Sequence, residues 1–161
     1  MINIVLSEEN IKIRNEIKKL FQNEVEGFDT IYSVFEIENS NQILDFCTEK
    51  NCDLLITDLQ KTKKHEFDTI KEILKINSNT EIILYTDSQK FDHAKEAIEL
   101  GISAYILKKS EDNQLLKEID KALKRIQLKN KVLNEGILKN LVTTGHVSYI
   151  RKLKKTELEN G

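Results

Sequence analysis

The chain has 161 residues, of which 39% are hydrophobic and 32% charged, with a formal net charge of -2. This balance is typical of a globular domain and disfavours both a disordered chain and a general electrostatic attraction to nucleic acid. No apolar run approaches the length of a membrane span and the first residues lack a secretion signal, so a cytoplasmic location without membrane partners is expected. Cys47 and Cys52 have no histidine at metal-ligand spacing and are interpreted as packing residues.

Five short runs rich in β-branched residues alternate with stretches of helical spacing, which predicts alternating strands and helices. The predicted strands are residues 2–6, 30–34, 54–57, 81–85 and 104–107. The fourth helix is expected to end at Gly101, a natural C-terminal cap, and the fifth to begin after Ser110. Strands this apolar must be parallel and covered on both faces, joined by right-handed crossovers. The sequence therefore predicts an α/β fold with a doubly wound five-stranded parallel sheet of order 2-1-3-4-5.

Polar residues follow the predicted strands. Glu8 and Glu9 follow the first strand, Asp58 the third, Thr86 the fourth and Lys108 the fifth. The first and third strands are neighbours where the strand order reverses, so the acids are expected to face one another. Carboxylate ligands without histidine or thiolate suit Mg²⁺. A carboxylate nucleophile, a metal ion, a hydroxyl group and a lysine are the groups that phosphoryl transfer onto an aspartate requires.

Four segments resemble response regulator receiver domains of two-component systems. They are Leu-Leu-Ile-Thr-Asp-Leu at 54–59, Ile-Ile-Leu-Tyr-Thr-Asp at 82–87, Phe-Asp-His-Ala-Lys-Glu-Ala-Ile at 91–98, and Gly101 with Ala-Tyr-Ile-Leu-Lys at 104–108. The chain is most similar to the YesN-like branch, in which the receiver precedes an AraC-type DNA-binding domain, over roughly residues 1–130. The resemblance implies the flavodoxin-like fold of CheY-like receivers and a sensor histidine kinase as partner. It also implies a phosphorelay signalling role that controls transcription. The chain would then be a phosphoacceptor signalling domain and not an enzyme.

The resemblance also implies a role for individual residues. Asp58 would be the phosphoacceptor, assisted by the Thr86 hydroxyl and the Lys108 ammonium, and Thr86 with Tyr105 would form the switch pair. The Mg²⁺ cofactor would be bound by Glu8, Glu9, Asp58 and the backbone carbonyl of Gln60. The phosphorylated chain would change the face formed by the fourth helix, fifth strand and fifth helix, through which it could form a homodimer.

The chain departs from the family at three places. Two glutamates replace an acidic pair that usually contains an aspartate, so a weaker Mg²⁺ affinity is one expectation. Residues 60–66 lack the usual Met-Pro pair and glycine, and Lys109 replaces a proline that usually follows a cis peptide bond. A cis bond before a residue other than proline costs about 3 kcal/mol, so a trans bond is predicted. These departures leave open a phosphorylation-independent pseudo-receiver that acts as a dimerisation or docking module.

Two enzyme classes on related folds are disfavoured. A mononucleotide or flavin site needs glycines or hydroxyls in the first turn, where Glu8 and Glu9 stand. A haloacid-dehalogenase-like phosphatase would carry a second aspartate two places after the nucleophile, and Gln60 occupies that position. No role is assigned to His65, His93 or His146, which lack ligand spacing.

The fifth helix carries a heptad pattern that predicts an extension beyond the receiver core. Its seam consists of Ile119, Leu123, Ile126, Asn130 and Leu133, and Ile137 continues it. This seam could pair with a second copy, although Gly136 weakens the helix and monomeric packing stays open. We expect a receiver over residues 1–128 and a helical linker or tail over 129–161. DNA contact would then need an output domain that the chain does not contain.

Overall fold

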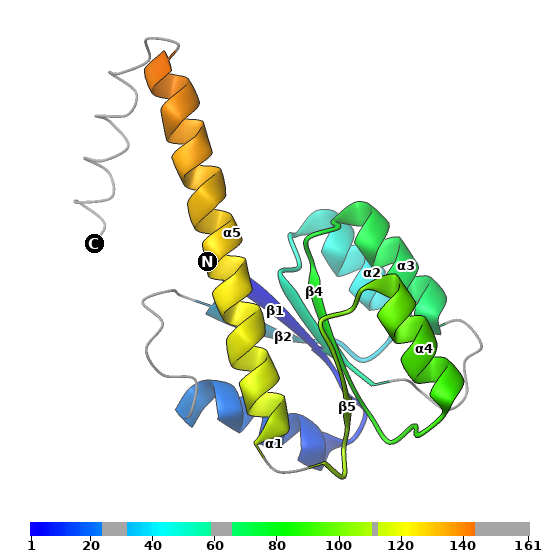
Figure 1. Cartoon of the computed structure of the whole chain (residues 1–161). Helices are drawn as coiled ribbons and strands as arrows, with labels where there is room; N and C mark the ends of the chain where they lie inside the picture. The colour runs from blue at the N-terminus through cyan, green and yellow to red at the C-terminus, as the bar shows by residue number, and fades with distance from the viewer. Residues whose placement is uncertain (24–31, 59–65, 111–112, 144–161) are drawn as a thin grey trace. The chain divides into compact units, whose positions relative to one another are not determined.

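The computed structural model describes residues 1–23, 32–58, 66–110 and 113–143, in which five strands alternate with five helices (Figure 1). The elements are β1 (Ile2–Ser7), α1 (Ile11–Asn23), β2 (Tyr32–Glu36), α2 (Ser40–Glu49), β3 (Leu54–Thr57), α3 (Glu66–Ile76), β4 (Glu81–Thr86), α4 (Phe91–Leu100), β5 (Ala104–Leu107) and α5 (Gln114–Thr143). The third and fifth strands match their predicted bounds, and the first and fourth each run one residue further. Residues 30–31, which were expected to open the second strand, lie outside the described residues.

The strands form one parallel sheet in the order β2-β1-β3-β4-β5, which confirms the predicted topology. β1 lies beside β3, with Ser7 opposite Thr57, and β4 lies beside β5, with Thr86 opposite Leu107. Every strand therefore ends at the same edge of the sheet. The side chains that follow the strands meet at this edge.

Apolar residues cover both faces of the sheet, as its near-continuous hydrophobic strands require. In Figure 1, α2, α3 and α4 lie on one side of the sheet and α1 on the other. One cluster joins Val5, Leu55 and Leu84 of the strands to the inner faces of α2, α3 and α4. Cys47 and Cys52 belong to this cluster as free, buried thiols, in agreement with their interpretation as packing residues.

Short polar residues and one glycine determine where several helices begin and end. The Asn10 side chain accepts hydrogen bonds from the backbone N–H groups of Lys12 and Ile13, and Asn39 caps α2 in the same way. Ser7 ends β1, so the residue that caps the start of α1 is Asn10. Gly101 ends α4 with a φ of 72°, a left-handed conformation that glycine adopts without steric cost, as predicted.

The chain forms two compact units, Met1–Leu123 and Lys124–Gly161, and α5 contributes residues to both. α5 begins at Gln114, and residues 111–112, which follow Ser110, lie outside the described residues. Gly136 lies inside α5 and does not interrupt it. Among the described helices, none is both long and apolar enough to cross a membrane.

Candidate functional site

The candidate site lies at the carboxyl edge of the sheet, where backbone hydrogen bonds bring the ends of four strands together. The Asp58 N–H donates to the carbonyl of Ser7 at the end of β1, over 3.4 Å. The Lys108 N–H donates to the carbonyl of Thr86 at the end of β4, over 2.9 Å. The parallel register therefore fixes the backbone of Asp58 and Lys108, and only their side chains remain to be positioned.

Lys108 links two carboxylates. Its Nζ lies 2.7 Å from Asp58 Oδ2 and 2.8 Å from Glu8 Oε2, and only 9% of its side chain is exposed. Burial alone would lower the pKa of the ammonium, but the hydrogen bonds and charges of Asp58 and Glu8 outweigh it and raise the pKa of Lys108. The lysine is therefore held protonated between the two acids.

Glu8 uses both carboxylate oxygens. Oε2 accepts from Lys108, and Oε1 accepts from the backbone N–H of Asn10 over 2.9 Å, with 5% of the side chain exposed. The longer glutamate side chain thus turns back onto its own loop. The neighbouring Glu9 is exposed, and the ion pairs that Lys108 makes within the described residues are with Glu8 and Asp58.

Oxygen ligands for a hard cation are present in part. Asp58 Oδ1 is buried and has no hydrogen-bond partner among the described residues, which leaves one carboxylate oxygen free for a ligand. Glu8 and Asp58 offer carboxylate oxygens, the ligand type that Mg²⁺ prefers, and both already contact one cation, the Lys108 ammonium. Within the described residues, no group of three or more acids, histidines or cysteines forms a ready metal site. The predicted ligand Gln60 lies outside the described residues.

The two predicted switch residues meet at Ser88, in the connection between β4 and α4. Thr86 is 1% exposed, and its Oγ1 accepts from the Ser88 N–H over 3.2 Å. Tyr105 is half-buried, and its hydroxyl donates to the Ser88 carbonyl over 2.6 Å. Neither side chain has a hydrogen bond to Asp58 among those found in the described residues.

The peptide bond after Lys108 is trans, as predicted for a chain with Lys109 in place of proline, and no described bond is cis. The trans bond still allows Lys108 to reach Asp58. Beside Lys108, a pocket of about 150 Å³ opens between α1 and β4. It is lined by Ile13, Glu16, Ile17, Leu20, Tyr85, Lys108, Ser110 and Leu115. Burial raises the pKa of Tyr85 there, against the opposing effect of the Lys108 charge.

The residues of the predicted dimer seam differ in exposure. Ile119, Leu123 and Ile126 are at most 3% exposed. Asn130 is exposed, and 63% of Leu133 and 49% of Ile137 are accessible to solvent. The apolar part of the seam that could meet a partner is therefore its second half.

Comparisons with known proteins identify the family. The family model described as the response regulator receiver domain matches residues 4–120, well over half of the chain. The chain belongs to the response regulator receiver family. Receiver domains of this kind are signalling domains of two-component systems, and they generally use Mg²⁺ and interact with histidine kinases.

The relatives of this receiver are transcriptional regulators. It is 28% identical over 142 residues to the transcriptional regulatory protein YdfI of Bacillus subtilis, covering 88% of this chain and 62% of YdfI. It is 24% identical over 90 residues to the uncharacterized transcriptional regulatory protein YesN of the same organism, covering 56% of this chain and 24% of YesN. The receiver thus spans less than two thirds of these relatives.

A solved structure gives the same fold. The signal receiver domain of a putative Luxo repressor protein from Vibrio parahaemolyticus superposes with a TM-score of 0.68 at 22% identity, covering 81% of this chain and 95% of that one. The shared strand order and the structural similarity confirm the expected α/β fold of CheY-like receivers.

Three contributors to this receiver site were missed from sequence. Asn10 holds Glu8, Ser88 joins the predicted switch residues, and His93 contacts Ser88. Asn10 carried a detectable signal, because asparagine just before an apolar-periodic stretch favours an N-cap. The contacts of Ser88 and His93 carried none, since they depend on how the β4–α4 connection folds over β5.

Proposed function

We propose that this receiver accepts a phosphoryl group on Asp58 from a phosphohistidine of a sensor histidine kinase. The observation that carries the proposal is the convergence of Asp58, Glu8 and Lys108 at the carboxyl edge of the sheet. A carboxylate nucleophile with a lysine at 2.7 Å is suited to phosphoryl transfer, because the ammonium can neutralise charge on the phosphoryl oxygens.

The proposed reaction needs little from the protein beyond positioning. An Asp58 oxygen forms a bond to phosphorus as the bond between phosphorus and the kinase imidazole nitrogen breaks, and the electron pair and a proton remain with the imidazole. Lys108 then exchanges its contact with the Asp58 carboxylate for one with the phosphoryl group. Thr86, buried beside this edge, would donate its hydroxyl to a phosphoryl oxygen.

In the same proposal, Asp58 and Glu8 would hold Mg²⁺, with Glu9 and the Gln60 carbonyl as the further predicted ligands. The bound ion would neutralise the phosphoryl oxygens. Support comes from the orphaned Asp58 Oδ1 and from the way that Asp58 and Glu8 already share a cation. Glu8 would need to release Asn10 or Lys108 to bind the metal, which predicts an affinity below that of a site whose acids are free.

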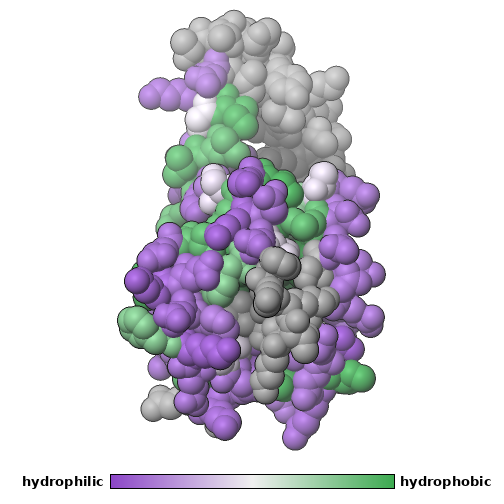
Figure 2. All heavy atoms as spheres, turned by 90° about the vertical axis from the view of Figure 1, so that its right-hand side faces the viewer, coloured by the Kyte–Doolittle hydropathy of each residue, from purple (hydrophilic) through white to green (hydrophobic). Residues whose placement is uncertain are grey.

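The proposed output is a change at Thr86 and Tyr105 that alters the face of α4, β5 and α5. α4 exposes Phe91 and Ile98, at 79% and 77%. Figure 2 shows the side of the molecule on which α4 lies in Figure 1, and hydrophobic residues are scattered there among hydrophilic ones. This face, or the second half of the α5 seam, would mediate a homodimer. Because the receiver spans only part of its transcription-regulator relatives, we further propose that an attached DNA-binding output domain provides the transcriptional function.

One observation favours a second candidate, the phosphorylation-independent pseudo-receiver. Lys108 already contacts both Glu8 and Asp58 and offsets one of their two negative charges, so the acids have a counter-ion without metal or phosphate. Such a chain would act through its surfaces as a dimerisation or docking module.

The two candidates differ in one product. We would incubate the chain with phosphoramidate and Mg²⁺ and measure its intact mass, with Asp58→Asn and an EDTA sample as controls. The proposal predicts one phosphoryl adduct in the unmutated chain with Mg²⁺ and none in either control. An unmodified mass under conditions that label another receiver would favour the pseudo-receiver.

A further inference from the structure

Ser88 connects the two proposed switch residues through its own backbone. Its N–H donates to Thr86 Oγ1 and its carbonyl accepts from the Tyr105 hydroxyl. The N–H and the carbonyl belong to the two peptide groups on either side of one Cα atom, so a displacement of the Ser88 Cα disturbs both contacts. Whatever fixes Ser88 therefore sets how Thr86 and Tyr105 respond to each other.

The side chain of Ser88 is fixed by His93, near the beginning of α4. Ser88 Oγ lies 2.7 Å from His93 Nδ1, within the range of a direct hydrogen bond. The Lys90 N–H also approaches Ser88 Oγ, over 3.5 Å. The Ser88 hydroxyl can donate or accept, so the tautomer of His93 decides which of the two groups is the donor.

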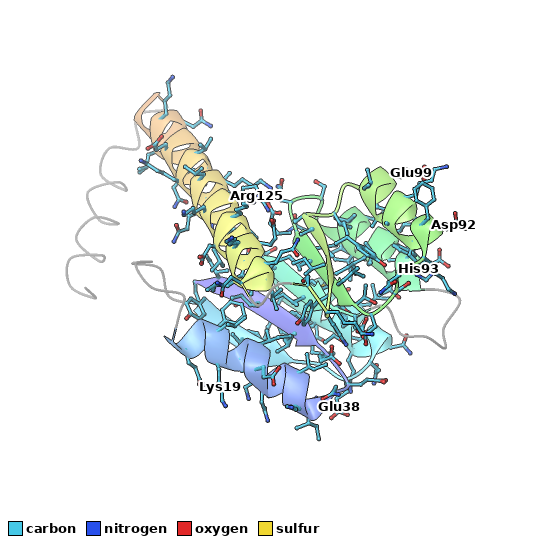
Figure 3. All side chains as sticks on the ribbon, turned by 60° about the horizontal axis from the view of Figure 1, so that its bottom comes forward. Lys19, Glu38, Asp92, His93, Glu99 and Arg125 are labelled. Carbon is cyan, nitrogen blue, oxygen red and sulfur yellow. The ribbon has the colours of Figure 1, made fainter. Side chains whose placement is uncertain are left out.

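His93 itself is held against α3. Its ring meets the ring of Phe67 edge to face, with centroids 5.8 Å apart, and the imidazole is half-buried. Figure 3 labels His93 at the end of α4 nearest the connection to β4, while Asp92 beside it points away. The imidazole thus joins α3, α4 and the β4–α4 connection.

We infer that His93 is a positioning residue of the switch: by holding Ser88, it keeps the Tyr105 hydroxyl on the Ser88 carbonyl and couples Thr86 to Tyr105 and α4. A role of this coupling in signalling rests on the proposed function, because Thr86 and Tyr105 act as switch residues only if Asp58 is phosphorylated. The anchoring of Tyr105 in the unphosphorylated chain does not depend on it.

The anchor is tested by the nitration of Tyr105 with tetranitromethane, measured on the tyrosine-containing peptide by mass spectrometry. His93→Phe keeps a ring against Phe67 but removes the nitrogen that contacts Ser88 Oγ, whereas His93→Asn places a polar amide group near the position of Nδ1. Glu99→Gln, an exposed change on the same helix, is the matched control. Without the anchor, Tyr105 leaves Ser88 more often and its phenol becomes more accessible.

We expect nitration of Tyr105 to be roughly five-fold faster in His93→Phe, the factor that one net hydrogen bond supplies. His93→Asn and Glu99→Gln should react at the rate of the unmutated chain. An unchanged rate in His93→Phe overturns the inference, and so does an equal acceleration in His93→Asn, which would assign the effect to ring packing.

The same variants separate this inference from the proposed function. Phosphoramidate labelling of Asp58 is measured in parallel, without reference to nitration. A chain that never forms the adduct but shows accelerated nitration in His93→Phe refutes the proposed phosphorylation and supports the anchor. A chain that is labelled normally but shows no change in nitration refutes the anchor alone.

Discussion

At the scale of single residues, Lys108 carries most of the electrostatics of the site. Replacing it by methionine in Lys108→Met leaves the carboxylates of Glu8 and Asp58 facing one another without a counter-ion. Breaking a buried ion pair in this way costs about 3 kcal/mol. We therefore expect the free energy of unfolding, measured by urea titration in EDTA at neutral pH, to fall by about this amount.

Lys109→Met is the matched control, because Lys109 is the next residue in the chain and is exposed. A surface change of this kind should alter the free energy of unfolding by no more than about 0.5 kcal/mol. Equal losses in the two variants would mean that Lys108 does not neutralise the acids in solution.

The same ion pairs predict a dependence on pH. The pKa of Lys108 is raised in the folded chain, so folding is linked to proton binding at this group. Its contribution to stability is complete below the usual lysine pKa, about 10.4, and is lost as pH rises through the higher folded value. The stability difference between the unmutated chain and Lys108→Met should therefore shrink above about pH 10.4 in urea titrations. A difference that stays constant to higher pH would contradict the raised pKa.

Sequence could predict that Asp58, Glu8 and Lys108 meet at one edge of the sheet, but not the full geometry of their contacts. The residue types of Asp58 and Lys108 follow from what phosphoryl transfer needs, and the parallel register brings the two side chains to 2.7 Å. The direction of the Glu9 side chain relative to Glu8 could not be predicted from the sequence, because adjacent residues of a loop can point in different directions. His93 was assigned no role, since its contact with Ser88 arises from tertiary structure.

At the scale of elements, replacing glycine by alanine is expected to have opposite effects on the free energy of unfolding at two positions. Gly101 has a φ of 72°, where a side chain is strained, so Gly101→Ala should lower the free energy of unfolding by about 1 kcal/mol. Gly136 lies in the interior of α5 with nothing within 4 Å of an added Cβ, so Gly136→Ala should stabilise the helix by about 0.5–1 kcal/mol.

The glycine variants are compared by thermal unfolding and by the helical signal of far-ultraviolet circular dichroism. Gly101→Ala should lower the melting temperature, and Gly136→Ala should raise the helical signal or its thermal persistence. Effects of the same sign in both variants would contradict the assigned conformations of these two residues.

The second half of the α5 seam predicts self-association. Leu133 is 63% exposed and continues the spacing of the buried residues before it, while Val132 is 68% exposed but lies on another face of the helix. If a dimer forms through the seam, Leu133→Lys should weaken it at least about ten-fold, because a charge would replace an apolar contact. Val132→Lys should leave it unchanged. Sedimentation equilibrium measures the dissociation constant of the dimer. A monomer at all concentrations, or equal effects of both variants, would refute dimerisation through the α5 seam.

At the scale of the whole molecule, the fold was predictable because local patterns and topology agree. Five apolar strands separated by amphipathic helices allow few arrangements other than a doubly wound parallel sheet, and the observed order is the expected one. The expected boundary between a receiver at 1–128 and a tail at 129–161 stays a prediction. A continuous helical pattern carries no signal that marks where a domain ends along it.

The receiver's relation to a longer regulator also belongs to this scale. The chain covers 62% of YdfI and 24% of YesN, and both of those proteins are transcriptional regulators by name. A signal accepted at Asp58 would therefore have to leave the receiver through its surfaces. The connection from Thr86 and Ser88 to α4 offers a physical route to one of them.

The central claim is that Asp58 becomes phosphorylated, and its most direct test locates the phosphoryl group. After treatment with phosphoramidate and Mg²⁺, borohydride reduction converts an acyl phosphate of aspartate to homoserine, which peptide mass spectrometry assigns to one position. We predict homoserine at position 58 in the unmutated chain and at no position in Asp58→Asn. Homoserine at another aspartate, or none at all where a reference receiver is converted, would contradict the assignment of Asp58 as the phosphoacceptor.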